Sequence, residues 1–72
     1  MSMDNVRDVK AFFAGNRDSV VHGFVDAMIA RRGDIHAALV KWHSSSVYVK
    51  APQSRRDVAD ARVTDFIRAV RK

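Results

Sequence analysis

Apolar residues recur along the chain at the three- and four-residue spacing of amphipathic helices, and this spacing predicts four of them. The predicted helices cover residues 5–14, 19–32, 34–43 and 55–70. The positions expected to face inward together are Val6, Val9, Phe13, Val20, Val21, Phe24, Met28, Ile35, Ala38, Leu39, Trp42, Ala59, Val63, Phe66, Ile67 and Val70. Trp42 is therefore predicted to be a core residue. Short connections between such helices are typical of a bundle.

Polar residues and glycines mark where these helices should begin and end. The predicted N-cap residues are Asp4 for the first helix, Asn16 or Asp18 for the second, and Asp34 for the third. Gly15 and Gly33 are predicted to end the first two helices in the left-handed conformation. Residues 54–57, Ser-Arg-Arg-Asp, are similar to a capping box with aspartate in the usual glutamate position. Gly23 lies inside a predicted helix, where it either costs about 1 kcal/mol relative to alanine or permits close helix packing.

The segment Ser44-Ser45-Ser46-Val47-Tyr48-Val49-Lys50 allows two structures. Three serines suit a cap or a turn better than a helix interior, and the Val-Tyr-Val run favours a strand. A short helix over residues 45–50, capped by Ser44, is the other interpretation. Pro52 limits both, because it pushes Ala51 out of helical geometry. The predicted fold is therefore all-α, a small four-helix bundle with either a short extended segment or a short helix near residues 46–50.

Length and composition agree with one small globular domain. The chain has 72 residues, of which 47% are hydrophobic and 29% are charged. A core of this size supplies only about 3–5 kcal/mol of net stability, and without cysteine no disulfide adds to it. A homodimer or a complex with a partner would bury more apolar surface. No apolar run approaches the roughly 18 residues of a membrane span, and residues 1–4 lack a secretory-signal layout, so we expect a cytoplasmic protein.

Positive charge is concentrated in the middle of the sequence. The net charge is +5 overall, and by segment it is −1 over residues 1–30, +5 over 31–56 and +1 over 57–72. A local excess of cations attracts polyanions and accelerates encounter with them. A basic surface that only keeps the protein soluble is the alternative interpretation.

Catalysis and cofactor binding receive little support from the sequence. The carboxylates are all aspartates, spread over caps and solvated faces, and the three glycines are isolated rather than gathered in a phosphate-binding loop. No nucleophile elbow surrounds the serines. His36 and His43 are seven residues apart, but no third ligand stands at a suitable spacing for a metal. We therefore expect no enzyme activity, no metal and no cofactor.

The run Gly33-Asp34-Ile35-His36-Ala37-Ala38-Leu39, followed by the serine-rich segment ending at Tyr48, resembles a helix-turn-helix unit. Paired alanines permit a close helix crossing, and a serine-rich helix start directs hydroxyl and amide groups at phosphates and base edges. The run is similar to the units of Fis-like and phage small-terminase-like regulators over about a quarter of the chain. It differs at the turn, where the chain has Trp42-His43 instead of glycine and an aliphatic residue.

A second resemblance leads elsewhere. The Val47-Tyr48-Val49 run, a turn and a basic helix are similar to part of the phage middle-operon activators. In that family the run is a strand that pairs with its symmetry mate. This likeness implies self-association through residues 47–49 instead of base readout.

Two functions follow as hypotheses. The first is a small DNA-binding transcription regulator of phage or mobile-element type, in which cations bind the phosphate backbone and Ser44, Ser45, Ser46 and Tyr48 lie nearest the bases. The predicted nucleic-acid-binding residues are Arg31, Arg32, Lys41, His43, Ser44, Ser45, Ser46, Tyr48, Lys50, Arg55 and Arg56. The alternative is a protein-interaction module that docks on a host enzyme such as RNA polymerase through the Val-Tyr-Val run.

Overall fold

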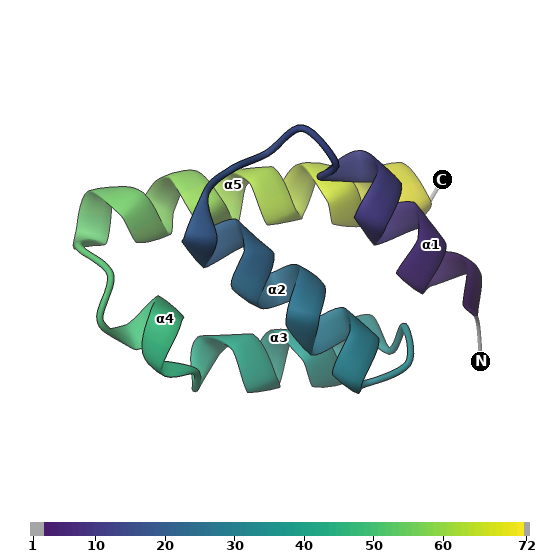
Figure 1. The fold of residues 1–72 in the computed structure, drawn as a ribbon, viewed down its shortest axis with the longest axis horizontal. Helices are drawn as coiled ribbons and strands as arrows, with labels where there is room; N and C mark the ends of the chain where they lie inside the picture. The colour runs from purple at the N-terminus through teal and green to yellow at the C-terminus, as the bar shows by residue number, and fades with distance from the viewer. Residues whose placement is uncertain (1–2, 72) are drawn as a thin grey trace.

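The described part of the chain folds into five helices, as a computed structural model of the protein shows (Figure 1). The structure describes residues 3–71. The helices are α1 (Met3–Phe12), α2 (Ser19–Ala30), α3 (Ile35–His43), α4 (Ser46–Val49) and α5 (Gln53–Val70). The all-α class is confirmed, with a fifth, single-turn helix added to the four expected. None of these helices is both long enough and apolar enough to cross a membrane.

Helix α2 lies at the centre of the domain and packs against each of the other four (Figure 1). Its sequence explains this position, because Val20, Val21, Phe24, Val25, Ala27 and Met28 are all buried, on more than one side of the helix. Helices α3 and α4 run along one side of α2, and α1 and α5 along the other. The domain measures 32 × 20 × 18 Å along its principal axes.

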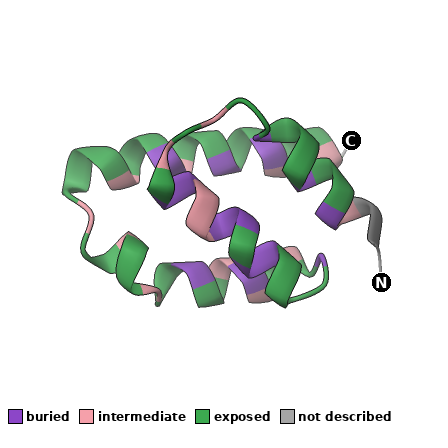
Figure 2. Ribbon diagram, in the orientation of Figure 1, coloured by how far each residue is buried: buried purple, intermediate pink, exposed green. Residues whose placement is uncertain are grey.

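The core is built from the predicted apolar stripes and is linked by aromatic rings (Figure 2). Phe24 of α2 touches Trp42 of α3 at 5.4 Å and Phe66 of α5 at 6.0 Å between ring centroids. Phe13, which follows α1, reaches Phe66 at 5.9 Å. Most of the predicted core positions are buried, and Ile35, Leu39, Ile67 and Val70 are partly buried against them. One aromatic chain therefore connects α1, α5, α2 and α3.

The caps of α2 and α3 are those predicted. The Asp18 carboxylate accepts a hydrogen bond from the Val20 amide at 2.8 Å, and Asp34 accepts one from the Ala37 amide at 3.1 Å. Gly33 has a φ of 87° and its amide donates to the Met28 carbonyl, which closes α2 as expected. Arg32 before it also has a positive φ, of 54°.

The end of α1 differs from the prediction. Helix α1 begins at Met3 and stops at Phe12, so each end lies two residues before the predicted bound, and Gly15 is not left-handed. The turn at residues 13–15 is closed by backbone hydrogen bonds, one of them from Asn16 to Phe13, that need no positive φ. The side chain of Asp4, the predicted cap, lies outside the described part of the structure.

Residues 46–49 are helical, so the extended alternative for this segment is wrong. Ser45, not Ser44, caps α4: its hydroxyl accepts from the Tyr48 amide and donates to the Trp42 carbonyl at 2.6 Å. Ser45 thus satisfies two backbone groups, the Trp42 carbonyl and the Tyr48 amide. This gain outweighs the strand preference of the Val-Tyr-Val run, which has no neighbouring strand to pair with. The strand implied by the likeness to middle-operon activators is therefore absent.

The capping box at the start of α5 is also wrong. The helix begins at Gln53, so Ser54 lies inside it, and the N-cap is Pro52, whose side chain has no acceptor for the free amides. Proline suits this position because its fixed φ fits the helix entry. The first turn is tied instead by the side chain of Gln53, whose Nε2 donates to the Asp57 carboxylate at 3.0 Å.

Gly23 permits a close approach between α2 and the α3–α4 unit. A Cβ on Gly23 would lie 2.7 Å from Cγ1 of Val47 and 3.2 Å from the Trp42 ring. The packing interpretation of this mid-helix glycine is therefore confirmed. Its position allows α4 to cover the middle of α2.

Candidate functional site

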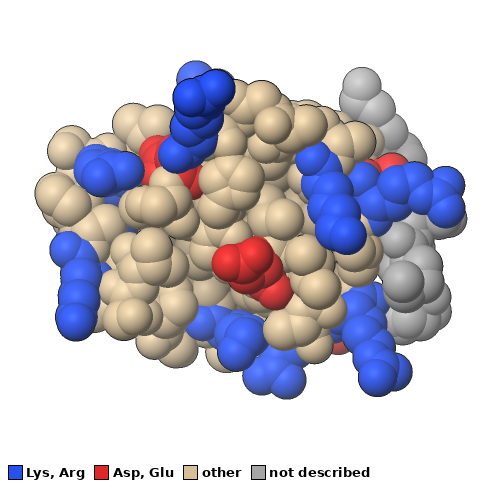
Figure 3. Space-filling model, in the orientation of Figure 1, with Lys and Arg blue, Asp and Glu red and all other residues tan. Residues whose placement is uncertain are grey.

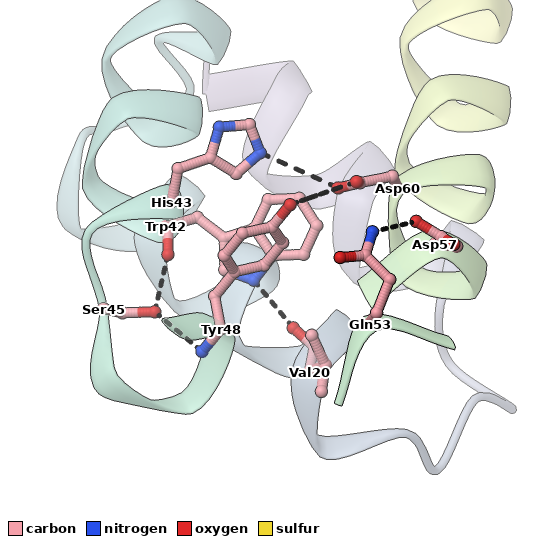
Figure 4. A network of polar contacts seen from close by, with 8 residues as sticks. All are labelled: Val20, Trp42, His43, Ser45, Tyr48, Gln53, Asp57 and Asp60. Atoms are coloured by element: carbon pink, nitrogen blue, oxygen red, sulfur yellow. Dashed lines mark hydrogen bonds and ion pairs between the residues drawn. The ribbon is translucent and has the colours of Figure 1, made fainter. Parts of the chain in front are cut away.

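Trp42 holds the α3–α4 unit against α2. Its indole Nε1 donates a buried hydrogen bond of 2.8 Å to the Val20 carbonyl, on the first turn of α2 (Figure 4). The neighbouring Ser45 hydroxyl donates to the Trp42 carbonyl. The indole therefore fixes the start of α4 relative to α2 as well as filling the core.

Tyr48, His43 and Asp60 connect α4, α3 and α5 in one network (Figure 4). The Tyr48 hydroxyl donates to the Asp60 carboxylate, with its oxygen 3.0 and 3.1 Å from the two carboxylate oxygens. Nε2 of His43 lies 3.7 Å from Oδ1 of Asp60, and the centroids of the His43 and Tyr48 rings are 4.7 Å apart. Arg56 lies over the outer face of Tyr48 at 6.0 Å. Tyr48 thus packs inward, and it cannot stack on a base without leaving this network.

The hydroxyl of Tyr48 is held in its neutral, donating form. Burial raises the pKa of Tyr48 above its ordinary value, and the hydrogen bond to Asp60 raises it further. A phenolate next to the Asp60 carboxylate would repel it, whereas the neutral hydroxyl bonds to it. The network is therefore intact at neutral pH.

We expect the native protein to release the Tyr48 proton at higher pH than the unfolded chain. Because the folded pKa is raised, this contribution to stability is complete below the ordinary value of 10.0 and is lost as pH rises through the folded pKa. Tyr48 is the sole tyrosine, so absorbance of tyrosinate reports it directly. Asp60→Asn should lower the pKa of Tyr48 in the native protein. Asp65→Asn, which changes an exposed aspartate on the same helix, should leave that pKa unchanged. Equal titration in native and unfolded protein would contradict the network.

Lys50, Arg55 and Arg56 lie where α4 meets α5, and Arg17 precedes the α2 cap Asp18 in the α1–α2 connection; we call these four cations the basic corner. The ion pair between Arg55 and Asp18, at 3.3 Å, brings the α1–α2 connection beside the start of α5. Arg17, the exposed neighbour of Asp18, joins the corner in this way. The uncapped first amides of the 18-residue helix α5 face the same region. In Figure 3 basic side chains stand at the left edge, where Figure 1 shows the α4–α5 connection.

A groove of about 700 Å³ runs along the junction of α2 and α3 and ends at α4. We call it the apolar groove. Its lining residues are Gly23, Asp26, Ala27, Arg31, Ala37, Val40, Lys41, Trp42, Ser44, Ser45 and Val47. Two of its valines are open to solvent, with 59% of Val40 and 36% of Val47 exposed.

The predicted nucleic-acid-binding residues do not form one surface. Lys50, Arg55 and Arg56 lie in the basic corner, whereas Arg31, Lys41, Ser44 and Ser45 line the apolar groove. His43 and Tyr48 belong to the Asp60 network. Arg32 is in the α2–α3 turn, at the opposite end of the long axis from the corner (Figure 1). Ser46 is exposed on the first turn of α4.

Two of the three serines are already used by the backbone. Ser44 donates its hydroxyl to the Val40 carbonyl at 3.0 Å, which ends α3, and Ser45 caps α4. Among the described residues, only the Ser46 hydroxyl of the three has no protein partner. The serine run therefore builds the α3–α4 turn first and offers few free donors to a ligand.

Sequence reasoning missed Arg17, Asp60 and Val40, whereas Val47 belongs to the Val-Tyr-Val run already considered as a docking surface. Arg17 was counted with the acidic first third of the chain, and only the fold carries it to α5. Asp60 looked like one more solvated aspartate on a long helix. Val40 is two residues from each of the buried Ala38 and Trp42, which places it on the opposite face of a helix. This spacing is the one local signal that could have predicted an exposed Val40.

Comparisons with known proteins find no match, whether the chain is set against protein-family models, curated proteins or solved structures. Within residues 3–71, no three His, Asp or Glu side chains gather closely enough to hold a metal ion. Functional inference therefore depends on the geometry of the basic corner and the apolar groove.

Proposed function

We propose that the protein is a small DNA-binding regulator that contacts the phosphate backbone through the basic corner. The observation that carries the proposal is the gathering of Arg17, Lys50, Arg55 and Arg56 around the start of α5. Arg17 and Lys50 are exposed and form no ion pair within residues 3–71, so their charges are available to a ligand, whereas Arg55 is paired with Asp18. Cations around a helix N-terminus are a common way to bind phosphate.

The proposed contact is mainly to the backbone. The segment that resembles a helix-turn-helix unit consists of α3, a Ser44-Ser45 turn and α4, and α4 has four residues. One helical turn reaches only a few base edges, and Tyr48 is engaged with Asp60. We therefore expect similar affinities for duplexes of unrelated sequence, with Ser46 as the residue of α4 best placed to approach a base.

Binding to duplex DNA should weaken steeply with salt. If three or four phosphates are neutralised, the slope of log K against log salt should be roughly −3, at about −0.9 per phosphate. Fluorescence anisotropy of a labelled duplex measures it. Arg17→Gln and Lys50→Gln should each reduce the slope by about 1 and weaken binding uniformly across sequences.

Arg68→Gln is the matched control, because it removes an equal charge from the last turn of α5, away from the corner. Its slope should equal that of the parent protein. Absence of binding at low salt, or equal effects of Arg17→Gln and Arg68→Gln, would show that the corner is not a phosphate site.

A further inference from the structure

The apolar groove combines features that a purely solvated surface lacks. Val40 and Val47 expose aliphatic surface in the lining of one concave site, which also includes Ala27 and Ala37. A DNA phosphate gains nothing from such a lining, whereas an apolar side chain does. The groove is therefore a separate surface from the basic corner.

The length of the groove fits a short helical segment. Along α2 it extends from Gly23 to Arg31, a rise of about 12 Å at 1.5 Å per residue, or roughly two helical turns. With Val40 more than half exposed, a compact small molecule would remain largely in water. A helix laid along the groove would instead cover both valines with residues at i, i+3 or i+4, and i+7.

Charge selects the chemistry of the occupant. Arg31 directly follows α2, Lys41 lies on α3, and Asp26 is the single acid of the groove. Within residues 3–71 none of the three forms an ion pair. The groove thus carries a net positive charge on a protein of net charge +5, which favours and steers an acidic partner.

Helices α5 and α1 of a second copy of the protein would be poor occupants of the groove. Val58, the most exposed valine of α5, has Arg55 and Arg62 as its neighbours on the helix face, so α5 would bring cations to a cationic groove. Phe12 of α1 is exposed, but its ring packs on Phe13 at 5.0 Å and on Phe66 at 5.6 Å. Neither surface offers a free apolar stripe with acidic flanks.

From these observations we infer that the apolar groove binds an amphipathic helical segment of another protein, apolar on one face and acidic on its flanks. The apolar face packs on Val40 and Val47, and the acidic flanks pair with Arg31 and Lys41. This inference does not depend on DNA binding at the basic corner. It assigns the protein a second, protein-binding surface.

The test uses synthetic peptides of about 15 residues, long enough for marginal helicity. Three carry Leu, Ile or Phe at the apolar positions with Glu on the flanks, and three matched peptides carry Lys instead of Glu. At least one acidic peptide should bind about tenfold or more tightly than its basic partner. Amide NMR signals of Gly23, Val40 and Val47 should shift on binding.

Val40→Glu should weaken the acidic peptide by about tenfold or more, since it removes apolar contact and adds a like charge. Val58→Glu is the matched control: Val58 is 53% exposed on α5, so the same substitution should leave affinity unchanged. Circular dichroism confirms that both variants are folded.

Four outcomes would overturn the inference. They are no binding by any acidic peptide, equal binding of acidic and basic peptides, signal shifts outside the groove, and shifts of groove signals with protein concentration alone, which would assign the groove to a second copy. Groove shifts with duplex DNA in place of peptide would likewise reassign the site to nucleic acid.

Discussion

Trp42→Ala is expected to leave the protein largely unfolded at room temperature. Trp42 is 1% exposed and is the largest side chain of the core. Truncation of a buried tryptophan costs about 3–5 kcal/mol, which equals the net stability of about 3–5 kcal/mol that a core of this size supplies. The substitution also removes the indole hydrogen bond to Val20, which attaches the α3–α4 unit to α2. Far-ultraviolet circular dichroism and urea titration measure the loss.

A milder variant separates the two roles of the indole. Trp42→Phe keeps an aromatic ring beside Phe24 but removes the donor, and we expect it to cost about 1–3 kcal/mol. The control is Val49→Ala, an exposed position on α4, which should change stability by no more than about 0.5 kcal/mol. A cooperative unfolding transition of Trp42→Ala close to that of the parent would refute the central place given to this residue.

Gly23→Ala should destabilise the protein although alanine is the better helix former. The methyl group would lie 2.7 Å from Cγ1 of Val47, a separation that real Cβ atoms essentially never show. Overpacking of this kind costs about 1–3 kcal/mol, against a helix-propensity gain of about 1 kcal/mol. The expected net loss is up to about 2 kcal/mol, measured by thermal or urea unfolding. Because Val47 must shift, NMR signals of residues 46–49 should shift as well.

A double variant tests the cause. In a Val47→Ala background the colliding Cγ1 is absent, so Gly23→Ala should cost far less than in the parent or should stabilise. Gly15→Ala is the control, because a Cβ there meets no atom within 4 Å and the backbone does not require glycine. It should be neutral or stabilise by up to about 1 kcal/mol. If Gly23→Ala stabilises the parent as Gly15→Ala does, the close approach of α4 is not a constraint.

The four long helices could be predicted because their burial is periodic along the chain. Each stripe, such as Val21, Phe24 and Met28 on α2, needs only local spacing to be recognised. Asp34 and Gly33 mark helix ends for the same local reason. Between Ser44 and Ser54 the short-helix alternative was confirmed, but both predicted caps were wrong, because caps compete there. Whether Ser44 or Ser45 caps a helix depends on which hydroxyl can reach the Trp42 carbonyl, and that is a property of the folded turn.

The candidate site was harder to predict because charge was judged along the sequence. Arg31 and Lys50 belong to one basic segment, but α3 and α4 lie between them, and they line different surfaces, the apolar groove and the basic corner. Arg17 lies in an acidic segment and is brought to the basic corner by the Asp18–Arg55 ion pair. The sequence did not decide whether Tyr48 packs inward or outward, because its orientation depends on a hydrogen bond to Asp60, twelve residues away.

Helix α1 begins and α5 ends at the same tip of the molecule, whereas the α4–α5 connection forms the other tip (Figure 1). Any cargo fused to either terminus, or any solid support that holds the chain by one of them, therefore attaches at the tip away from the basic corner. The corner then projects outward from whatever carries the domain. Joining the two ends by a short linker would also cost little closure entropy, which makes this domain a suitable unit for insertion into a loop of another protein.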